Sequence, residues 1–249
     1  MKVSHWSVSS ALLAIFLTSC AAMKEENIPD SPLPELYHQG LSFYQQKNYK
    51  KAIECFKAVE RQYPYDHATI QAQLMIGYLQ YLRREYNDAI NSFKLFIELN
   101  PYHKEVPYAL YMLGMSYFQQ LSVVQRDQSS AKDALDHFEL LRNRYPESIY
   151  RKDSIEKIKT IEDHLAGKHV DIARFYLNNR SYDSAVSRLL EAITVFPRST
   201  HVPEAKWRLV EAYDHLGLNK QAKMMAQDLV KNCPHTEWAN HAQRFLNGI

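Results

Sequence analysis

The sequence predicts an all-α protein, built as a solenoid of five helical hairpins. Three glycines recur at intervals of 37 residues, at Gly40, Gly77 and Gly114. Each is followed by an alanine and, four residues later, an aromatic ring; these pairs are Ala52 and Phe56, Ala89 and Phe93, and Ala134 and Phe138. Each set ends at a proline, at position 64, 101 or 146. Repeats of this length are typical of helical solenoids, which are usually binding surfaces.

The repeated residues have a simple role in helix packing. A glycine on the first helix and an alanine on the second allow close approach, and the ring one turn later fills the space beside them. The proline ends the second helix and leads into the next repeat. The pattern continues with Ala185 and Pro197, then with Ala222 and Pro234, so successive alanines lie 37, 45, 51 and 37 residues apart. This spacing favours a 37-residue unit with insertions in the third repeat and before the fourth.

The first three hairpins are expected in order along the chain. They pair residues 34–46 with 49–63, 67–82 with 86–99, and 104–121 with 130–145. Asn48 is a candidate N-cap of the first of these second helices, and Ser129 or Ser130 of the third.

The second half begins with a helix longer than any other. Apolar residues keep helical phase through Gly167, which predicts one helix over 149–179 that joins the two halves, with a kink or break possible at the glycine. Helices over 182–196, 201–216 and 219–232 complete the fourth and fifth repeats. A last helix near 236–247, carrying Trp238 and Phe245, is expected to cap the open end of the stack.

The N-terminus is typical of a secretion signal that ends at a lipidation site. The apolar run Val8–Leu17 is too short to span a bilayer. It ends in Leu17-Thr18-Ser19-Cys20, which resembles a bacterial lipobox, so residues 1–19 are expected to be removed and Cys20 lipidated. The alternative is an ordinary signal peptide with a chance cysteine. Ala21 favours passage to the outer membrane, two or three acyl chains would give stable attachment, and residues 20–33 would form the lipidated tether.

Composition and motifs argue against an enzyme. A formal net charge of +2 gives no nucleic-acid-binding surface. There is no glycine-rich phosphate loop, no zinc spacing among the 11 histidines and no nucleophile elbow. We expect no catalytic residue, no metal and no cofactor. Cys55 and Cys233 lie in the first and fifth repeats, so they are expected to be far apart and unpaired.

The repeated positions resemble the tetratricopeptide (TPR) repeat over about residues 33–234. Its small residue is matched by Gly40, Gly77, Gly114 and Ala173, and its aromatic by Phe43, Tyr117, Tyr176 and Tyr213. Gln80 and Val210 depart from the pattern. The resemblance implies a right-handed superhelix in which the first helices line a concave groove.

The groove positions of the TPR repeat are mostly aromatic in the first half of this chain. The aromatic ones are Tyr37, Tyr44, Tyr78, Tyr81, Tyr108, Tyr111 and Phe118, and the others are Leu41, Leu74, Leu82 and Met115. Such rings suit the binding of an extended peptide; the alternative is that they pack between neighbouring helices. The equivalent positions of the fifth repeat are Glu204, Trp207, Glu211, Asp214 and His215. The two halves are therefore expected to bind different partners.

The lipobox, the short tether and five repeats with a long helix after the third together resemble the BamD family, lipoprotein subunits of the outer-membrane β-barrel assembly machinery. Short matches occur at 61–64, 99–101 and 144–148, and the insertion near Arg126 also fits. The resemblance implies a non-catalytic, lipid-anchored scaffold on the periplasmic face of the outer membrane.

The same resemblance implies the partners of the two halves. Residues 34–148, the first three repeats, would receive unfolded outer-membrane proteins through a C-terminal signal that ends in an aromatic residue. Residues 149–249 would dock on the POTRA domains of a BamA-like barrel protein, alongside other lipoproteins of the complex. Arg188 aligns with an arginine that the family uses near the BamA contact; the alternative is a solvated arginine.

Two other functions remain open from the sequence. One is a periplasmic TPR adaptor for cell division or envelope coordination (CpoB-like), although such adaptors usually carry an N-terminal coiled coil and no lipobox. The other is a TPR lipoprotein that recruits a protease or a peptidoglycan enzyme.

Overall fold

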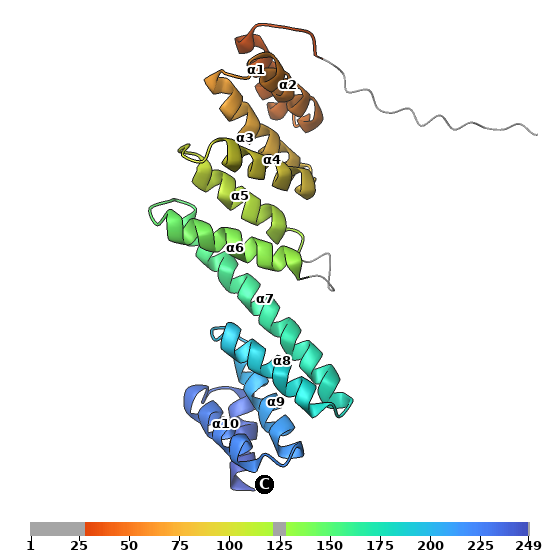
Figure 1. The fold of residues 1–249 in the computed structure, drawn as a ribbon, viewed down its shortest axis with the longest axis vertical. Helices are drawn as coiled ribbons and strands as arrows, with labels where there is room; N and C mark the ends of the chain where they lie inside the picture. The colour runs from red at the N-terminus through yellow and green to blue at the C-terminus, as the bar shows by residue number, and fades with distance from the viewer. Residues whose placement is uncertain (1–27, 122–127, 249) are drawn as a thin grey trace, which may run out of the picture.

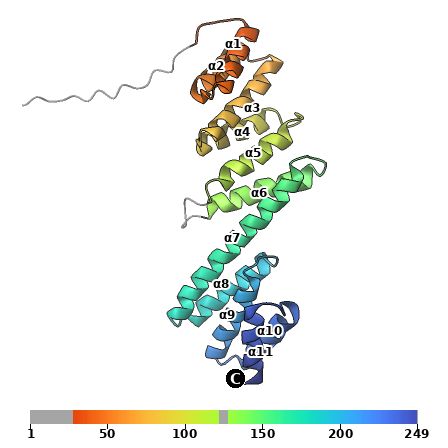
Figure 2. The same ribbon diagram turned by 180° about the vertical axis from the view of Figure 1, so that it is seen from behind.

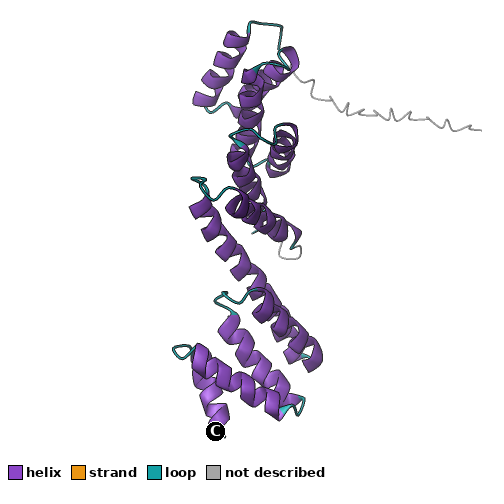
Figure 3. Cartoon of the chain, turned by 60° about the vertical axis from the view of Figure 1, so that its left-hand side comes forward, coloured by secondary structure: helices purple, strands orange, loops and turns teal. Residues whose placement is uncertain are grey.

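A computed structural model of the chain describes residues 28–121 and 128–248. Over these residues eleven helices follow one another, joined by loops and without a strand (Figure 3). They form an elongated stack with the α1–α2 hairpin at one end and α11 at the other (Figures 1 and 2). The predicted all-α solenoid is confirmed. The signal segment, Cys20 and the insertion near Arg126 lie outside the described residues.

The helices of the first half are α1 (Leu33–Gln45), α2 (Tyr49–Gln62), α3 (His67–Leu82), α4 (Tyr86–Leu99), α5 (Val106–Phe118) and α6 (Ser129–Arg144). Those of the second half are α7 (Arg151–Asn178), α8 (Tyr182–Val195), α9 (Val202–His215), α10 (Asn219–Asn232) and α11 (Glu237–Asn247). Every expected helix is present. Helix α5 is shorter than expected at both ends, and Pro107 lies in its first turn, where the missing N–H of proline has no cost.

Side-chain caps were predicted correctly at only one of two helices. The Asn48 side chain accepts a hydrogen bond from the backbone N–H of Lys51 and caps α2. The expectation of a serine cap on α6 is wrong, because the helix begins at Ser129 and its N-cap residue is Gln128, which makes no side-chain cap. Both serines therefore lie inside the first turn.

The glycine positions of the first three repeats each lie against an aromatic ring, as the packing argument predicted. A Cβ built on Gly40, Gly77 or Gly114 would lie 2.8 to 2.9 Å from a ring carbon of Phe56, Phe93 or Phe138. All three rings are fully buried. In the fourth repeat the glycine position is taken by Ala173, which is larger than glycine, and the ring position by Leu189, which is smaller than phenylalanine. In the fifth repeat the same two positions are Val210 and Ala226. Val210 is therefore compensated by a smaller partner, which keeps the total volume near constant.

Helix α7 belongs to two hydrophobic cores and so joins the halves. Ile158, Ile161 and Leu165 pack into the core of α5 and α6, whereas Val170 and Ala173 pack into the core of α8 and α9. The helix continues unbroken through position 167. Because Gly167 has no side chain, the imidazole of His201 approaches closely; a Cβ there would lie 2.8 Å from its Nε2.

A carboxylate ties the loop between α8 and α9 to the middle of α7. Asp163 accepts hydrogen bonds from Ser199 Oγ at 2.8 Å and from both N and Oγ1 of Thr200 at 2.7 Å. Burial opposes ionisation of Asp163, but the hydrogen bonds from Thr200 and Ser199 outweigh it and lower the pKa of the carboxyl group. This contact fixes the second half onto the joining helix. Cys55 and Cys233 are both free, as expected.

Candidate functional site

The seven residues predicted to line a groove lie on α1, α3 and α5, which are neighbours along the first half. We call them the aromatic face: Tyr37, Tyr44, Tyr78, Tyr81, Tyr108, Tyr111 and Phe118. Each is partly buried and packs against one of the two hydrophobic cores of the first half. The alternative of core packing therefore holds for all seven residues, each of which is also partly exposed, and groove lining stays a prediction.

Rings from successive repeats contact one another along this face. The Tyr44 ring centroid lies 6.2 Å from that of Tyr78, with the planes at 66°, and 6.3 Å from that of Tyr49. At the start of the face, the edge of Tyr37 meets Phe56 at 5.3 Å. Edge-to-face pairs of this kind add about 0.5–1.5 kcal/mol beyond the area they bury. The first two repeats are thus connected by ring contacts.

The third repeat continues the face onto the first turn of α7. The rings of Tyr111 and Tyr150 stack at 5.0 Å with an interplanar angle of 21°, and Tyr108 lies 5.6 Å from the same Tyr150. The Tyr111 hydroxyl donates a hydrogen bond of 2.8 Å to Asp153 Oδ2. The aromatic face therefore ends against the start of α7, after three repeats.

Polar contacts hold the edge of the aromatic face near α5. Gln119 Nε2 donates to the Tyr81 hydroxyl at 3.2 Å. The Tyr81 ring lies 5.6 Å from Tyr86. Lys157 Nζ lies 5.3 Å from the ring centroid of Phe118, a cation–π contact made by α7. The orientation of these rings is therefore set by neighbours on α4, α5 and α7.

Burial raises the pKa of several tyrosine hydroxyls in the aromatic face. It raises the pKa of Tyr78, to which a hydrogen-bonding interaction with Tyr44 adds. It also raises the pKa of Tyr108 and Tyr111 well above the ordinary value, and the hydrogen bond to Asp153 adds to the effect on Tyr111. At neutral pH these tyrosines are uncharged, and they offer ring surfaces for apolar groups and hydroxyls for hydrogen bonds.

Three participating residues were missed from the sequence: Tyr150, Asp153 and Lys157. A signal was present, because Asp153 lies seven residues after Pro146, just as Tyr108 lies seven residues after Pro101. The spacing from the proline therefore shows that the start of α7 has the same place after Pro146 as α5 has after Pro101, which is that of the first helix of a repeat. The long helix was interpreted only as a connection between halves, so its first turns were not considered as part of the face.

The corresponding surface of the second half is charged. Arg174 Nε on α7 lies 3.0 Å from Glu204 Oε1 on α9, and Arg208 pairs with both Glu204 and Glu211. Beside these ion pairs lies a hollow of about 370 Å³. Its lining comprises Arg174, Leu177, Asn178, Tyr182, Arg208, Glu211 and His215. The two halves thus offer chemically different surfaces.

Arg188 lies on α8 with its side chain 42% exposed. Its Nη1 lies 3.2 Å from Glu191 Oε2, and that same oxygen lies 3.3 Å from Nδ1 of the buried His169. Arg188 is therefore an accessible cation whose partner also faces a buried imidazole.

Within residues 28–121 and 128–248, no group of three or more His, Cys, Asp or Glu side chains is placed to hold a metal ion. In the same ranges, no helix is both long and apolar enough to cross a membrane. The surfaces above offer contacts for binding: rings and hydroxyls in the first half, and ion pairs in the second.

Comparisons with known proteins find a matching family, similar proteins and solved structures of partial similarity. The model of the family YfiO, described as outer membrane lipoprotein, matches residues 29–229. A protein of Rickettsia prowazekii named outer membrane protein assembly factor BamD is 35% identical over 99% of this chain and 98% of its own length. A protein of the same name from Caulobacter vibrioides is 34% identical over 97% of this chain and 80% of its length. Among solved structures, the TPR2AB domain of yeast Sti1 is 16% identical, covers 86% of this chain and 82% of its own, and aligns with a TM-score of 0.43.

Proposed function

Because the chain belongs to the YfiO family of outer membrane lipoproteins, we propose that it is a non-catalytic scaffold in the assembly of outer-membrane β-barrel proteins. The observation that carries this proposal is the match, over nearly the full chain, to relatives named as outer membrane protein assembly factors. That match favours the assembly role over the two alternatives, a cell-division adaptor and a lipoprotein that recruits a hydrolase.

In this proposal the aromatic face receives unfolded barrel precursors. Its rings come from three successive repeats, and those of the first and second contact each other through Tyr44 and Tyr78. An extended peptide lying across the first helices would therefore meet an aromatic side chain in each repeat. An aromatic residue at the end of the peptide would pack on these exposed ring surfaces. Because the tyrosines are uncharged at neutral pH, binding would not require desolvation of a charge.

The second half is proposed to dock on POTRA domains of a BamA-like barrel protein. Its ion pairs and the accessible Arg188 suit a polar partner surface, where charge complementarity fixes orientation. Other lipoproteins of the assembly complex would join the same scaffold. Cys20 is proposed to carry the acyl chains that hold the protein on the periplasmic face of the outer membrane.

The test is a mild-detergent pull-down of the tagged lipoprotein from its own envelope, with mass spectrometry of the proteins that co-purify. A POTRA-containing barrel protein as the main partner would support the assembly role. A division protein, protease or peptidoglycan enzyme in its place, with no barrel protein, would overturn it.

A further inference from the structure

Three loops that lead from one repeat to the next present an almost fully exposed apolar side chain. These are Tyr65 between α2 and α3, Tyr102 between α4 and α5, and Ile149 between α6 and α7, exposed by 101%, 94% and 85%. The loops lie in a row along the left edge of the solenoid in Figure 1, because every second helix runs back to the same side. We call residues 63–66, 100–105 and 145–150 the loop edge. Two tyrosine rings and an isoleucine thus project from the same edge of three successive repeats.

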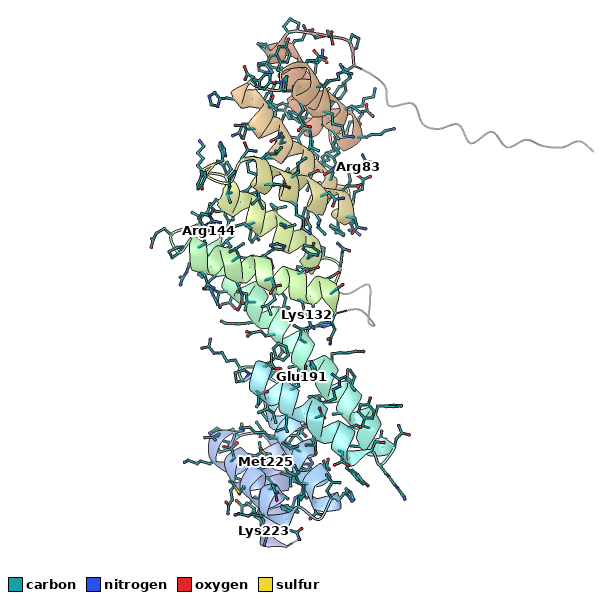
Figure 4. The ribbon with its side chains drawn as sticks, viewed as in Figure 1. Arg83, Lys132, Arg144, Glu191, Lys223 and Met225 are labelled. Carbon is teal, nitrogen blue, oxygen red and sulfur yellow. The ribbon has the colours of Figure 1, made fainter. Side chains whose placement is uncertain are left out.

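Exposed basic side chains accompany these apolar tips. Those at or beside the loop edge are Arg61, Lys104, Arg144, Arg151 and Lys152, and the exposed acids there are Asp66, Glu98, Glu147 and Asp153. Between the second and third loops lies a hollow of about 410 Å³. Its lining comprises Pro101, Tyr102, His103, Lys104, Pro107, Arg144 and Tyr145. Figure 4 places Arg144 at this edge and Arg83 at the opposite one. Tyrosine combined with Lys and Arg is the chemistry that favours the headgroup region of a bilayer.

The start of the described chain is held against the same edge. Arg61 Nη2 donates to the carbonyl of Ile28 at 2.6 Å, and the Tyr63 hydroxyl donates to the carbonyl of Ser31 at 2.9 Å. The Gln62 side chain adds two hydrogen bonds, one to the Pro29 carbonyl and one from the Ser31 N–H. Residues 28–31 therefore leave the fold at the end of α2, beside the loop that carries Tyr65.

This attachment limits how far the loop edge can lie from a lipid anchor. Cys20 precedes Ile28 by eight residues, which span at most about 29 Å when fully extended. The opposite edge of the first hairpin is farther away by the length of α2, which at 14 residues is about 21 Å. The chain therefore leaves the fold nearer the loop edge than the opposite edge, and an acyl chain on Cys20 reaches the loop edge with the shorter tether.

We propose that the loop edge rests on the phospholipid headgroups of the membrane to which the protein is anchored. Tyr65 and Tyr102 enter the interface between headgroups and acyl chains, Ile149 extends the contact to the third repeat, and Lys104 and Arg144 face lipid phosphates. The inference rests on the lipid anchor of the proposed function, and on none of its protein partners.

Tryptophan fluorescence tests the contact directly. The lipidated mature protein is placed on vesicles of phosphatidylethanolamine and phosphatidylglycerol that contain a brominated phospholipid as quencher. Tyr65→Trp and Tyr102→Trp place a reporter at two loop tips, and Gln46→Trp places one on an exposed residue at the opposite edge of the first hairpin. The wild-type protein, whose tryptophans after Cys20 are Trp207 and Trp238, gives the reference emission. We expect the added emission to be quenched at positions 65 and 102 and not at 46.

Flotation of the vesicles separates failure of the anchor from failure of the contact. Protein that does not float lacks a lipid anchor, which overturns the inference together with that part of the proposed function. Protein that floats without quenching at 65 and 102, or with equal quenching at 46, overturns the contact and leaves the anchor intact. If quenching is absent and a Tyr65→Ser/Tyr102→Ser variant loses a co-purifying protein, the loop edge instead binds a protein partner.

Discussion

The ring of Phe93 fills the space that a side chain on Gly77 would need. A Cβ built at Gly77 would lie 2.9 Å from Cε1 of Phe93, closer than real Cβ contacts allow, and the ring is fully buried. The same relation recurs between Gly40 and Phe56. The closeness of the two helices in each of the first three hairpins is therefore set by contact between a backbone and a ring.

Gly77→Leu should lower the melting temperature, because overpacking a buried helix crossing costs about 1–3 kcal/mol. Thermal unfolding followed by circular dichroism measures the change. Adding Phe93→Leu to Gly77→Ala should recover part of the stability that Gly77→Ala loses, since it removes the ring that the new Cβ meets. A melting temperature equal to that of the wild type in Gly77→Leu would show that this crossing is not tightly packed.

The free energy of unfolding should fall as the pH is lowered from about 7.5 to 5. Burial lowers the pKa of His169; Glu191 opposes the shift, whereas Arg188 on α8 and Lys132 on α6 add to it. The unfolded chain thus takes up a proton near the ordinary pKa of about 6.5, before the folded chain does. The contribution of His169 to the free energy of unfolding is fully present above that pH. It is lost as the pH falls toward the folded pKa, by at most about 1.4 kcal/mol per pH unit for one proton.

Urea denaturation across this range, compared between wild type and His169→Gln, isolates the contribution of His169. The variant should lose stability less steeply, and His137→Gln should remove a further part, because burial lowers the pKa of His137 as well. His235→Gln, at an exposed position, serves as the matched control. Identical slopes in wild type and His169→Gln would contradict the prediction.

Tyr44→Leu combined with Tyr78→Leu should weaken the binding of peptides that end in an aromatic residue. The leucines retain apolar contact with the core, but the ring pair at 6.2 Å and both hydroxyls are lost. A loss of about 1.4 kcal/mol, or tenfold in Kd, is expected from ring contacts of ordinary strength. Fluorescence anisotropy with a labelled peptide measures the change. Tyr182→Leu in the second half should bind as the wild type does; equal affinity in all three proteins would remove the aromatic face from the binding site.

Arg188→Glu should abolish co-purification of the barrel partner. The change reverses an accessible charge and places it beside Glu191, and loss of one charge in a buried interface pair can cost about 2–5 kcal/mol. Lys220→Glu, at an exposed position in α10, reverses a charge elsewhere in the second half and should retain the partner. A folded Arg188→Glu protein that still brings down the barrel protein would rule out this arginine as a docking residue.

Cys20→Ser should leave the protein unprocessed or free of the membrane fraction, because the serine hydroxyl does not accept the lipid. Fractionation of the envelope with immunoblotting measures the distribution, and mass spectrometry of the wild type should find the acyl chains on Cys20. Unchanged membrane attachment in the variant would reject the lipobox.

Much of the fold could be predicted because each repeat obeys a local rule. The residues at the helix crossing, Gly77 with Phe93 for example, are complementary in size and close in sequence, so spacing alone reveals them. The aromatic face was only partly predictable. Tyr44 and Tyr78 repeat with the solenoid, but Tyr150 and Asp153 join the face from a helix that was interpreted only as a connection between the halves. The prediction of a serine cap on α6 was wrong because the N-cap residue is Gln128, one position before Ser129 and two before Ser130.

The sequence by itself determined the hairpins, their order and the family, since period, small residues and prolines act over a few turns of helix. Only the tertiary structure decided that each of these tyrosines packs on the core while staying partly exposed, and that Gly167 allows the approach of His201 within an unbroken α7. It also decided that residues 28–31 leave the fold beside Tyr65. These features depend on contacts between segments more than 30 residues apart, and no local pattern records where such segments meet.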